Sequence, residues 1–178
     1  MSKDANLPVE TMWEGKYIVA KKQGTWEYVG RARGIEAAVI LAVDDEDHVL
    51  LVDQFRMPLG RRCLELPAGL IGDEVAGEDV TVAAARELEE ETGYRPGRIE
   101  AVGSFNSSPG MVTEGFTLMR ATELVKTGEG GGVDGEDITV HRVPLAEVEG
   151  FIAAKRAEGF AMDVKLLLLL GAGILAGR

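Results

Sequence analysis

The sequence predicts an α+β fold in which helices cover both faces of a mixed β-sheet. Strand-like runs come first, one short helix interrupts them, further strands follow, and two helices close the chain. This order lacks the regular alternation of a Rossmann fold and favours an α/β/α sandwich. The length of 178 residues fits one domain with a small appendage, and the hydrophobic content of 46% is that of an ordinary globular protein.

The N-terminal segments are expected to form a β-hairpin ahead of the main fold. Residues 16–22 and 26–33 are short mixed runs, and Gln23-Gly24-Thr25 between them is typical of a turn. We therefore divide the chain into an N-terminal extension, residues 1–33, and a main domain, residues 34–178.

The first strands of the main domain are predicted at residues 35–43 and 49–52, where apolar β-branched side chains are frequent. The acidic residues 44–47 between them are typical of a turn. Both runs are apolar enough to be central strands. Pro67 and Gly69 then predict an irregular turn before the first helix.

That helix is predicted to lie between Asp79, a candidate N-cap, and Gly93, a stop signal. At about 100° per residue, Glu87, Glu90 and Glu91 share one side of it. We expect the preceding turn to face this acidic side. The opposite side, expected to be buried, carries Val82, Ala85 and Leu88.

Beyond the helix, the sequence predicts a turn, two strands and a glycine-rich lid. Pro96 and Gly97 mark the turn, and residues 99–105 and 115–123 are the strands. The segment 128–135, which contains five glycines, is expected to be a mobile lid of the same domain, because a strand-like run follows it.

Two helices are expected at the C-terminal end. Pro144 and Glu147 open the first, which extends to about Arg156, and Asp163 precedes the second. The apolar run 166–176 has eleven residues, whereas a bilayer crossing needs about 20. We expect this run to form a buried helix.

The charge balance limits the partners of the protein. The chain has 19 Lys and Arg against 30 Asp and Glu, a formal net charge of −11, which disfavours nucleic acid and anionic membrane surfaces. A small anionic substrate would therefore need local cations. The single cysteine, and a start without the apolar core of a signal peptide, lead us to expect a cytoplasmic protein.

The three helical glutamates form a candidate metal site. Carboxylates at i, i+3 and i+4 repel one another unless a cation lies among them, and oxygen ligands suit Mg²⁺ or Mn²⁺. Arg86 could hold Glu78 or Glu90 in one orientation. Taken alone, three glutamates on one side of a helix are more often a solvated acidic surface.

A longer pattern of fixed spacings favours the metal site. Its members are Gly72, Glu78, Arg86-Glu87-Leu88, Glu90-Glu91 and Gly93-Tyr94. The pattern resembles the complete signature of the Nudix hydrolases. This resemblance implies the Nudix fold and an enzyme with two or more Mg²⁺ ions, with Mn²⁺ as an alternative. The implied metal ligands are Glu87, Glu91 and the carbonyl of Ala68, with Glu90 sharing or orienting a metal.

Two further motifs resemble the ADP-ribose pyrophosphatase branch of that family. Gln54-Phe55-Arg56 followed by Glu65-Leu66-Pro67-Ala68-Gly69 is similar to a strand and turn whose Arg and first Glu contact substrate. Ser108-Pro109-Gly110 is similar to a loop in which a proline accompanies preference for ADP-ribose. The resemblance thus assigns Arg56, Glu65 and Pro109 to substrate binding.

The segment Asp134-Gly135-Glu136-Asp137-Ile138 resembles an acidic loop that delivers a catalytic glutamate in this branch. We assign that role to Glu136. Asp134 and Glu114 are alternatives, because the glycine-rich approach allows more than one register.

The N-terminal extension resembles a segment that is exchanged between subunits in the family's dimers. The similar motifs are Glu14-Gly15-Lys16-Tyr17 and Trp26-Glu27-Tyr28-Val29. In a homodimer, Tyr17 and Trp26 would enclose adenine across the interface, with Arg31 as a candidate for the phosphates.

The implied reaction is hydrolysis of the pyrophosphate bond of ADP-ribose to AMP and ribose 5-phosphate, with Glu136, Glu90 and Arg86 as catalytic residues. Nucleotide sugars, flavin dinucleotide and oxidised nucleotides are alternative substrates that would use the same metal site. A third interpretation is a silent Nudix domain that senses a nucleotide, which the presence of all three helical glutamates disfavours.

Overall fold

The computed structural model describes residues 3–32, 36–71, 79–133 and 135–177. Gly72 and Glu78 of the signature, and Asp134 of the acidic loop, lie outside the described residues. The strands are β1 (Glu10–Glu14), β2 (Ile18–Gln23), β3 (Trp26–Arg31), β4 (Glu36–Ala42), β5 (His48–Arg56), β6 (Arg61–Glu65), β7 (Ala68–Ile71), β8 (Tyr94–Asn106), β9 (Gly115–Lys126), β10 (Thr139–Pro144) and β11 (Ala161–Met162). The helices are α1 (Val80–Thr92), α2 (Val148–Ala157) and α3 (Leu167–Leu175).

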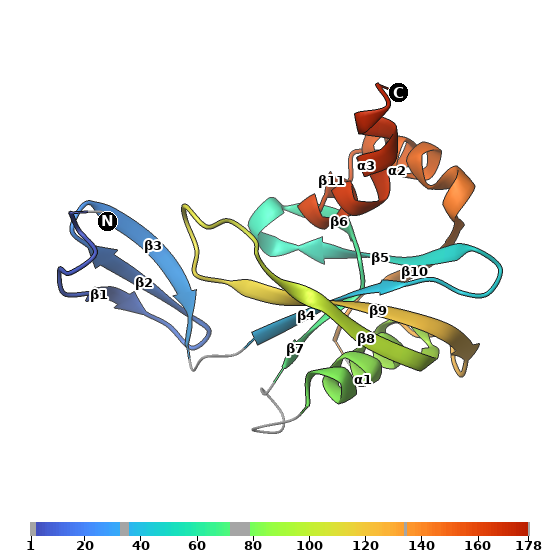
Figure 1. Ribbon diagram of the computed structural model, residues 1–178, viewed down its shortest axis with the longest axis horizontal. Coiled ribbons are helices and arrows are strands. Elements are labelled where there is room, and N and C mark those ends of the chain that lie inside the picture. Colours follow the sequence, from blue (N-terminus) through green and yellow to red (C-terminus); the bar gives the residue numbers. More distant parts are fainter. Residues whose placement is uncertain (1–2, 33–35, 72–78, 134, 178) are drawn as a thin grey trace.

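The main domain has α1 on one side of its strands and α2 and α3 on the opposite side (Figure 1). Its strands form two four-stranded sheets, in the orders β7-β4-β9-β8 and β10-β5-β6-β11. Both sheets are mixed, since β4 runs parallel to β9 and β6 runs parallel to β11. The predicted α+β class and α/β/α layering are therefore confirmed, with two sheets in place of one. The inner positions of β4 and β5 were also predicted correctly.

Two clusters of buried apolar side chains hold these layers together. The first joins both sheets to α2 and contains Val39, Val49, Leu51, Leu64, Leu66, Leu118, Val143, Val148, Ile152 and Leu166. The second packs α1 onto β4, β5 and β9 and contains Ala38, Ile40, Ala42, Leu50, Ala84, Leu88, Met119 and Ala121. Alternate side chains of β4 enter the two clusters, because successive residues of a strand point to opposite faces.

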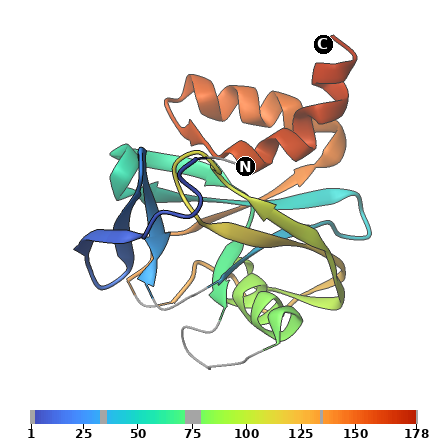
Figure 2. The ribbon, with the colours of Figure 1, turned by 60° about the vertical axis from the view of Figure 1, so that its left-hand side comes forward.

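The N-terminal extension is a three-stranded sheet in the order β1-β2-β3, so one strand precedes the predicted hairpin. The loop between β8 and β9 attaches to this sheet. The Val29 N–H donates to the Met111 carbonyl at 3.0 Å, and the Thr113 N–H donates to the Val29 carbonyl at 2.9 Å. Figure 2 shows this loop beside the N-terminal sheet. The extension is therefore joined to its own chain at the loop that carries Pro109.

The prediction of a turn at Pro96 and Gly97 is wrong, because β8 already begins at Tyr94. Pro96 pairs with Leu124 of β9. The proline is tolerated there because β8 is an edge strand. On the outer side of an edge strand, no neighbouring strand needs the N–H that proline lacks.

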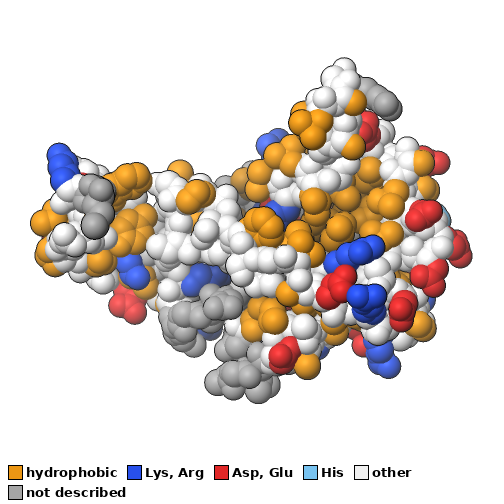
Figure 3. Space-filling view, viewed as in Figure 1, with side chains coloured by type: hydrophobic (Ala, Val, Ile, Leu, Met, Phe, Trp, Pro, Cys, Tyr) orange, Lys and Arg blue, Asp and Glu red, His pale blue; other side chains and the backbone are white. Residues whose placement is uncertain are grey.

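The prediction of a buried C-terminal helix is also wrong. The side chains of Leu167, Leu168 and Leu175 are 52%, 50% and 90% exposed, and hydrophobic side chains stand out on the C-terminal helices in Figure 3. Only one face of α3 is covered, where Leu169 and Leu170 pack against the first cluster. None of the helices in the described part of the chain has the length and apolar character that a membrane crossing requires.

The buried face of α1 agrees with the predicted one at Leu88 and differs from it at Val82. Ala84 and Leu88 are fully buried, whereas Val82 is 57% exposed. The helix packs on the strands through Ala84, Leu88 and Glu91, at i, i+4 and i+7, and this direction turns Val82 toward solvent. Glu91 is therefore at the buried edge of the helix, although it is acidic.

Replacing Leu88 by Ala should destabilise the protein by about 2–5 kcal/mol, because the fully buried side chain leaves a cavity. Val82→Ala, on the same helix, should change the unfolding free energy by no more than about 0.5 kcal/mol. Urea unfolding measures both. Equal losses for the two variants would contradict this packing of α1.

Candidate active site

The ends of α1 are capped as the sequence predicts. The Asp79 carboxylate accepts the Thr81 N–H at 2.8 Å at the N-terminus. At the C-terminus, Gly93 adopts φ +74°, a left-handed conformation that glycine favours, and its N–H donates to the Glu89 carbonyl at 2.8 Å. These caps place the three glutamates on the last turns of the helix.

Glu91 is a buried carboxylate in contact with β7. Its exposed fraction is 6%, and one of its oxygens accepts the Ala68 N–H at 3.1 Å. Burial raises the pKa of Glu91 to about 8, against the lowering effect of the Ala68 hydrogen bond. The neighbouring charges of Glu87 and Glu136 raise this pKa further, and Arg56 lowers it. Glu87 and Glu136 are therefore near enough for their charges to act on Glu91.

The backbone of β7 passes close to Glu87. A Cβ atom at Gly69 would lie 2.1 Å from the Glu87 Cγ, so a larger residue at this position would displace the Glu87 side chain. With the Ala68 contact to Glu91, this proximity confirms that the turn before α1 faces the acidic side of the helix.

Arg86 contacts two carboxylates of its own helix. One guanidinium nitrogen is 3.0 Å from Glu90, four residues later, and another is 3.0 Å from Glu87. Of the two partners expected for Arg86, Glu90 is therefore present, while Glu78 lies outside the described residues. Arg86 thus orients two of the predicted metal ligands.

Arg56 and Glu65 form a bidentate ion pair between β5 and β6. The two N–O distances are 2.6 and 2.7 Å, and the Glu65 side chain is 7% exposed. The hydrogen bonds to Glu65 raise the pKa of Arg56. The pair fixes the planar guanidinium, which suits phosphate contacts.

Arg31 and Glu114 join the N-terminal sheet to the loop before β9. The Arg31 Nε donates to a Glu114 oxygen at 2.8 Å. Both side chains line the same cleft as the helical glutamates. Arg31 thus lines the same cleft as Arg56, the other arginine that the resemblance assigns to substrate binding.

The glycine-rich segment is docked on the C-terminal end of α1. The N–H groups of Gly131 and Gly132 donate to the carbonyls of Glu91 and Glu90 at 2.8 and 3.0 Å. A Cβ atom at Gly130 would lie 2.4 Å from the Thr92 carbonyl carbon. The described part of the expected mobile lid is therefore anchored, and its glycines permit the close approach.

Glu136 follows this anchored segment and lines the cleft with Glu87 and Glu91. Its carboxylate accepts the Val133 N–H at 3.1 Å, and its own N–H donates to the Val133 carbonyl at 3.0 Å. The structure thus places Glu136, to which the sequence analysis assigned the catalytic role, in the same cleft as the helical glutamates.

The cleft has a volume of about 820 Å³ and carries a strong excess of negative charge. Among the described residues, seven acidic and four basic side chains line it. The acidic residues are Glu65, Glu87, Glu90, Glu91, Glu114, Glu136 and Asp163, and the basic residues are Arg31, Arg56, Arg86 and Lys165. An anionic ligand would be repelled unless further cations entered with it.

The residues of the cleft fit a hard divalent cation. In the described part of the chain, no three Asp, Glu, His or Cys side chains are gathered closely enough to hold a metal ion as they stand. However, the available donors are carboxylate and carbonyl oxygens, which suit Mg²⁺ and Mn²⁺. Besides burial, the negative charges of Glu87 and Glu136 raise the pKa of Glu91, so these carboxylates repel one another. A cation would relieve that repulsion.

Sequence reasoning missed Lys165, whose Nζ donates to Asp163 at 2.7 Å and lies 5.6 Å from the centre of the Phe116 ring. Asp163 was interpreted only as a helix start, and its carboxylate does accept the Lys165 N–H. The pairing of β11 with β6 brings both residues to the cleft, and no local pattern signals that pairing.

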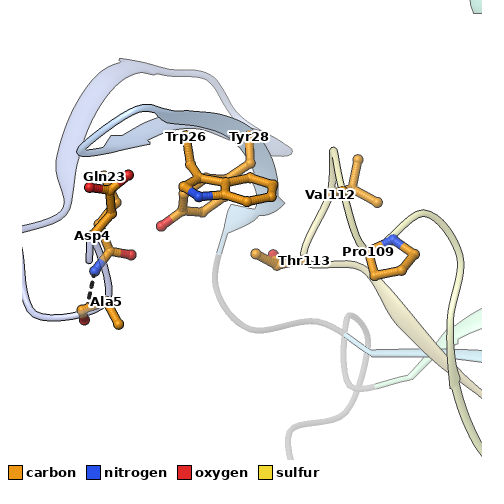
Figure 4. A pocket seen from close by; sticks show the side chains of 9 residues that line it. Asp4, Ala5, Gln23, Trp26, Tyr28, Pro109, Val112 and Thr113 are labelled. Atoms are coloured by element: carbon orange, nitrogen blue, oxygen red, sulfur yellow. Dashed lines mark hydrogen bonds between the residues drawn. The ribbon is translucent and has the colours of Figure 1, made fainter. Parts of the chain in front are cut away.

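Trp26 and Pro109 lie in a separate hollow of about 300 Å³ between the N-terminal sheet and the loop before β9. Figure 4 shows Trp26 and Tyr28 between Gln23 and the loop of Pro109. Tyr17 does not line this hollow. Within one chain, Tyr17 precedes the start of β2, whereas Trp26 begins β3 and pairs with Gln23 at the end of β2. The six residue pairs between β2 and β3 separate Tyr17 from Trp26 by roughly 20 Å.

A polar hollow of about 350 Å³ shares lining residues with both the aromatic hollow and the acidic cleft. Thr113 lines both the aromatic and the polar hollow. Arg31 and Glu114 line both the polar hollow and the cleft. The aromatic hollow, the polar hollow and the cleft are therefore neighbours along the surface.

Comparison with known proteins agrees with this site. The NUDIX domain family matches residues 33–162. A methanol dehydrogenase activator from Bacillus methanolicus is 36% identical over 121 residues, which cover 67% of this chain and 64% of that protein. An ADP-ribose pyrophosphatase from Bacillus subtilis is 42% identical over 88 residues, which cover 49% of this chain and 46% of that protein.

A GDP-mannose pyrophosphatase from Cronobacter sakazakii is 36% identical over 147 residues, covering 78% of this chain and 72% of that protein. A solved structure described as an ADP compounds hydrolase superposes with a TM-score of 0.70 over 96% of this chain and 94% of that one, at 22% identity. That structure shares the fold. The chain therefore belongs to the Nudix family, and its relatives there include ADP-ribose pyrophosphatases, as the signature and its neighbouring motifs predicted.

Proposed function

We propose that the protein hydrolyses the pyrophosphate bond of ADP-ribose to AMP and ribose 5-phosphate. The observation that carries this proposal is the convergence of Glu87, Glu91 and Glu136 beside Arg56 in one cleft. Phosphoryl transfer to water needs positioned charges more than a covalent nucleophile, and the cleft supplies both acids and a fixed guanidinium. The similarity to ADP-ribose pyrophosphatases supports the substrate class.

The proposed cofactor is Mg²⁺, with Mn²⁺ as an alternative. Glu87, Glu90, Glu91 and the Ala68 carbonyl would hold it, and Arg86 would keep Glu87 and Glu90 oriented. When bound, the cation neutralises charge on the diphosphate oxygens and makes a coordinated water more acidic. The excess of acidic side chains in the cleft supports this requirement for added positive charge.

Glu136 is proposed to take the proton of the attacking water or to fix the position of that water. The water oxygen bonds to one phosphorus, the bridging P–O bond breaks, and the phosphate on the other side leaves. Of the alternatives, Asp134 lies outside the described residues, and Glu114 is already paired with Arg31 at 2.8 Å. The location of Glu136 beside Glu91 favours it over Glu114.

Arg56 is proposed to contact the diphosphate, since its guanidinium is fixed by Glu65 at the cleft. The base would lie against Trp26, in the aromatic hollow beside the polar one. The roughly 20 Å between Tyr17 and Trp26 along the strands means that a sandwich of these two rings needs Tyr17 from a second copy. A homodimer is thus part of the proposal.

A second candidate function is hydrolysis of a nucleotide sugar. The similarity to a GDP-mannose pyrophosphatase over 78% of this chain favours it. The same acidic cleft would serve that reaction, and only the contacts to the base and the terminal sugar would differ.

ADP-ribose should be the best substrate by kcat/KM in a panel with GDP-mannose and flavin dinucleotide, with AMP release followed by chromatography. Activity should require Mg²⁺ or Mn²⁺ and disappear with chelator. Glu91→Gln should lose turnover by roughly 100-fold or more, because a ligand of the cation is removed. Preference for GDP-mannose would favour the second function, and normal turnover of folded Glu91→Gln would contradict the metal site.

Trp26→Ala should raise the KM for ADP-ribose about tenfold, because base stacking on an aromatic ring contributes about 1–3 kcal/mol. Tyr17→Ala should also raise the KM, but only if a second copy of the chain completes the base site. Light scattering therefore measures the oligomeric state of the protein in parallel. Tyr28→Ala tests the hollow within one chain. A KM unchanged by Trp26→Ala would exclude this hollow as the base site.

Without metal, stability should fall as the pH rises from about 5 to about 8. The pKa of Glu91 is raised from 4.5 to about 8 on folding, so the folded state keeps a proton that the unfolded state releases. That stabilisation is complete below pH 4.5 and is lost as the pH passes the folded pKa of about 8. Glu91→Gln should remove this part of the pH dependence and be more stable at high pH, by up to about 5 kcal/mol.

Thermal unfolding in the presence of chelator measures this effect. The pH is varied from about 5 to about 9, a range that begins just above the ordinary pKa of this carboxyl and ends just above its raised pKa. Glu10→Gln, on the exposed strand β1, is the matched control and should follow the original protein. Parallel curves for the original protein and Glu91→Gln would contradict the buried, protonated carboxyl.

A further inference from the structure

Arg62 of β6 is held by a buried carboxylate on the neighbouring strand. Its Nε donates to the Asp53 carboxylate, and its Nη2 donates to the Asp53 carbonyl at 2.9 Å. The Asp53 side chain is 3% exposed, and its other oxygen contacts the Nε2 of His141 on β10 at 2.5 Å. The guanidinium is therefore fixed to the sheet on one side, as a planar fork with five donors allows.

The other side of the same guanidinium holds the chain after Glu136. Nη1 donates to the Asp137 carboxylate at 2.6 Å, and Nη2 donates to the Asp137 carbonyl at 3.0 Å and to the Thr139 hydroxyl at 3.1 Å. The Asp137 side chain is 81% exposed, so its position depends on this contact and not on packing.

Glu136 therefore lies between two anchors. Upstream, Gly131 and Gly132 donate to carbonyls at the end of α1. Downstream, Arg62 holds Asp137. The hydrogen bonds of Glu136 itself go only to Val133, three residues earlier, within the described residues. They shape the loop but do not attach it to the sheet.

We infer that Arg62 is a positioning residue that sets the location of Glu136 relative to the glutamates of α1. This inference rests on the function proposed above. A displacement of about 1 Å in a reacting group can cost about 100-fold in rate, so release of the downstream anchor should lower turnover. Substrate and metal affinity should change little, because Arg62 lines none of the hollows that would hold them.

The variant Arg62→Lys separates positioning from stability. Lysine keeps a positive charge beside buried Asp53 but lacks the planar fork that reaches Asp53, Asp137 and Thr139 together. The matched control is Arg142→Lys. Arg142 on β10 also bridges two carboxylates, Asp44 at 2.6 Å and Glu46 at 2.8 Å, but at the opposite end of that strand from Thr139.

Two measurements test the inference on the full chain with Mg²⁺. Steady-state hydrolysis of ADP-ribose should show kcat reduced about 10- to 100-fold in Arg62→Lys, with KM within about twofold, and near-original values in Arg142→Lys. Hydrogen exchange should show faster exchange at residues 135–138 in Arg62→Lys only. In a Glu136→Gln background, Arg62→Lys should cause little further loss, because the residue through which it acts is already gone.

The outcomes distinguish this inference from the proposed function. If hydrogen exchange at residues 135–138 is the same in Arg62→Lys as in the original protein, the inference is overturned whatever the activity. It is also overturned if Arg62→Lys keeps the original kcat while Glu136→Gln is inactive. Full additivity of the two substitutions also overturns it. If the original chain hydrolyses no diphosphate while exchange rises as expected, the proposed function fails and the anchoring by Arg62 stands.

Discussion

The C-terminal end of α1 is the constraint on which the site depends. Carbonyls at a helix end need donors, and here Gly131, Gly132 and Thr127 donate to those of Glu91, Glu90 and Gly93. The same turns carry the acidic side chains, although the negative end of the helix dipole and the burial of Glu91 both disfavour a carboxylate there. The protein therefore maintains a region of unfavourable negative charge, which a divalent cation can relieve.

The basic side chains of the cleft are constrained by ion pairs with neighbouring acidic side chains. Each of its four described basic side chains already has an acidic partner: Arg31 with Glu114, Arg56 with Glu65, Arg86 with Glu87 and Glu90, and Lys165 with Asp163. These pairs hold the cations in fixed directions but weaken their attraction for phosphate. The protein thus fixes the orientation of these cations, and under the proposed function a bound divalent cation would supply the further positive charge that a diphosphate needs.

The loop between β8 and β9 connects the two parts of the chain. Through Val29 it is hydrogen-bonded to the N-terminal sheet, and through Glu114 it reaches the cleft. Trp26 and Pro109 face each other across the hollow that results. The contacts that would read the base therefore depend on an extension with little core of its own, and the chemistry depends on the main domain.

The sequence by itself determined the features that depend on neighbouring residues. The caps of α1, the clustering of its glutamates and the central strands β4 and β5 follow from capping, helical spacing and runs of β-branched residues. Tertiary structure alone decided the burial of Glu91, the exposure of Val82 and α3, and the pairs Arg56–Glu65 and Arg62–Asp137. These features depend on which strands pair and on the direction from which a helix meets a sheet. Contacts between distant residues set both, and no local pattern encodes them.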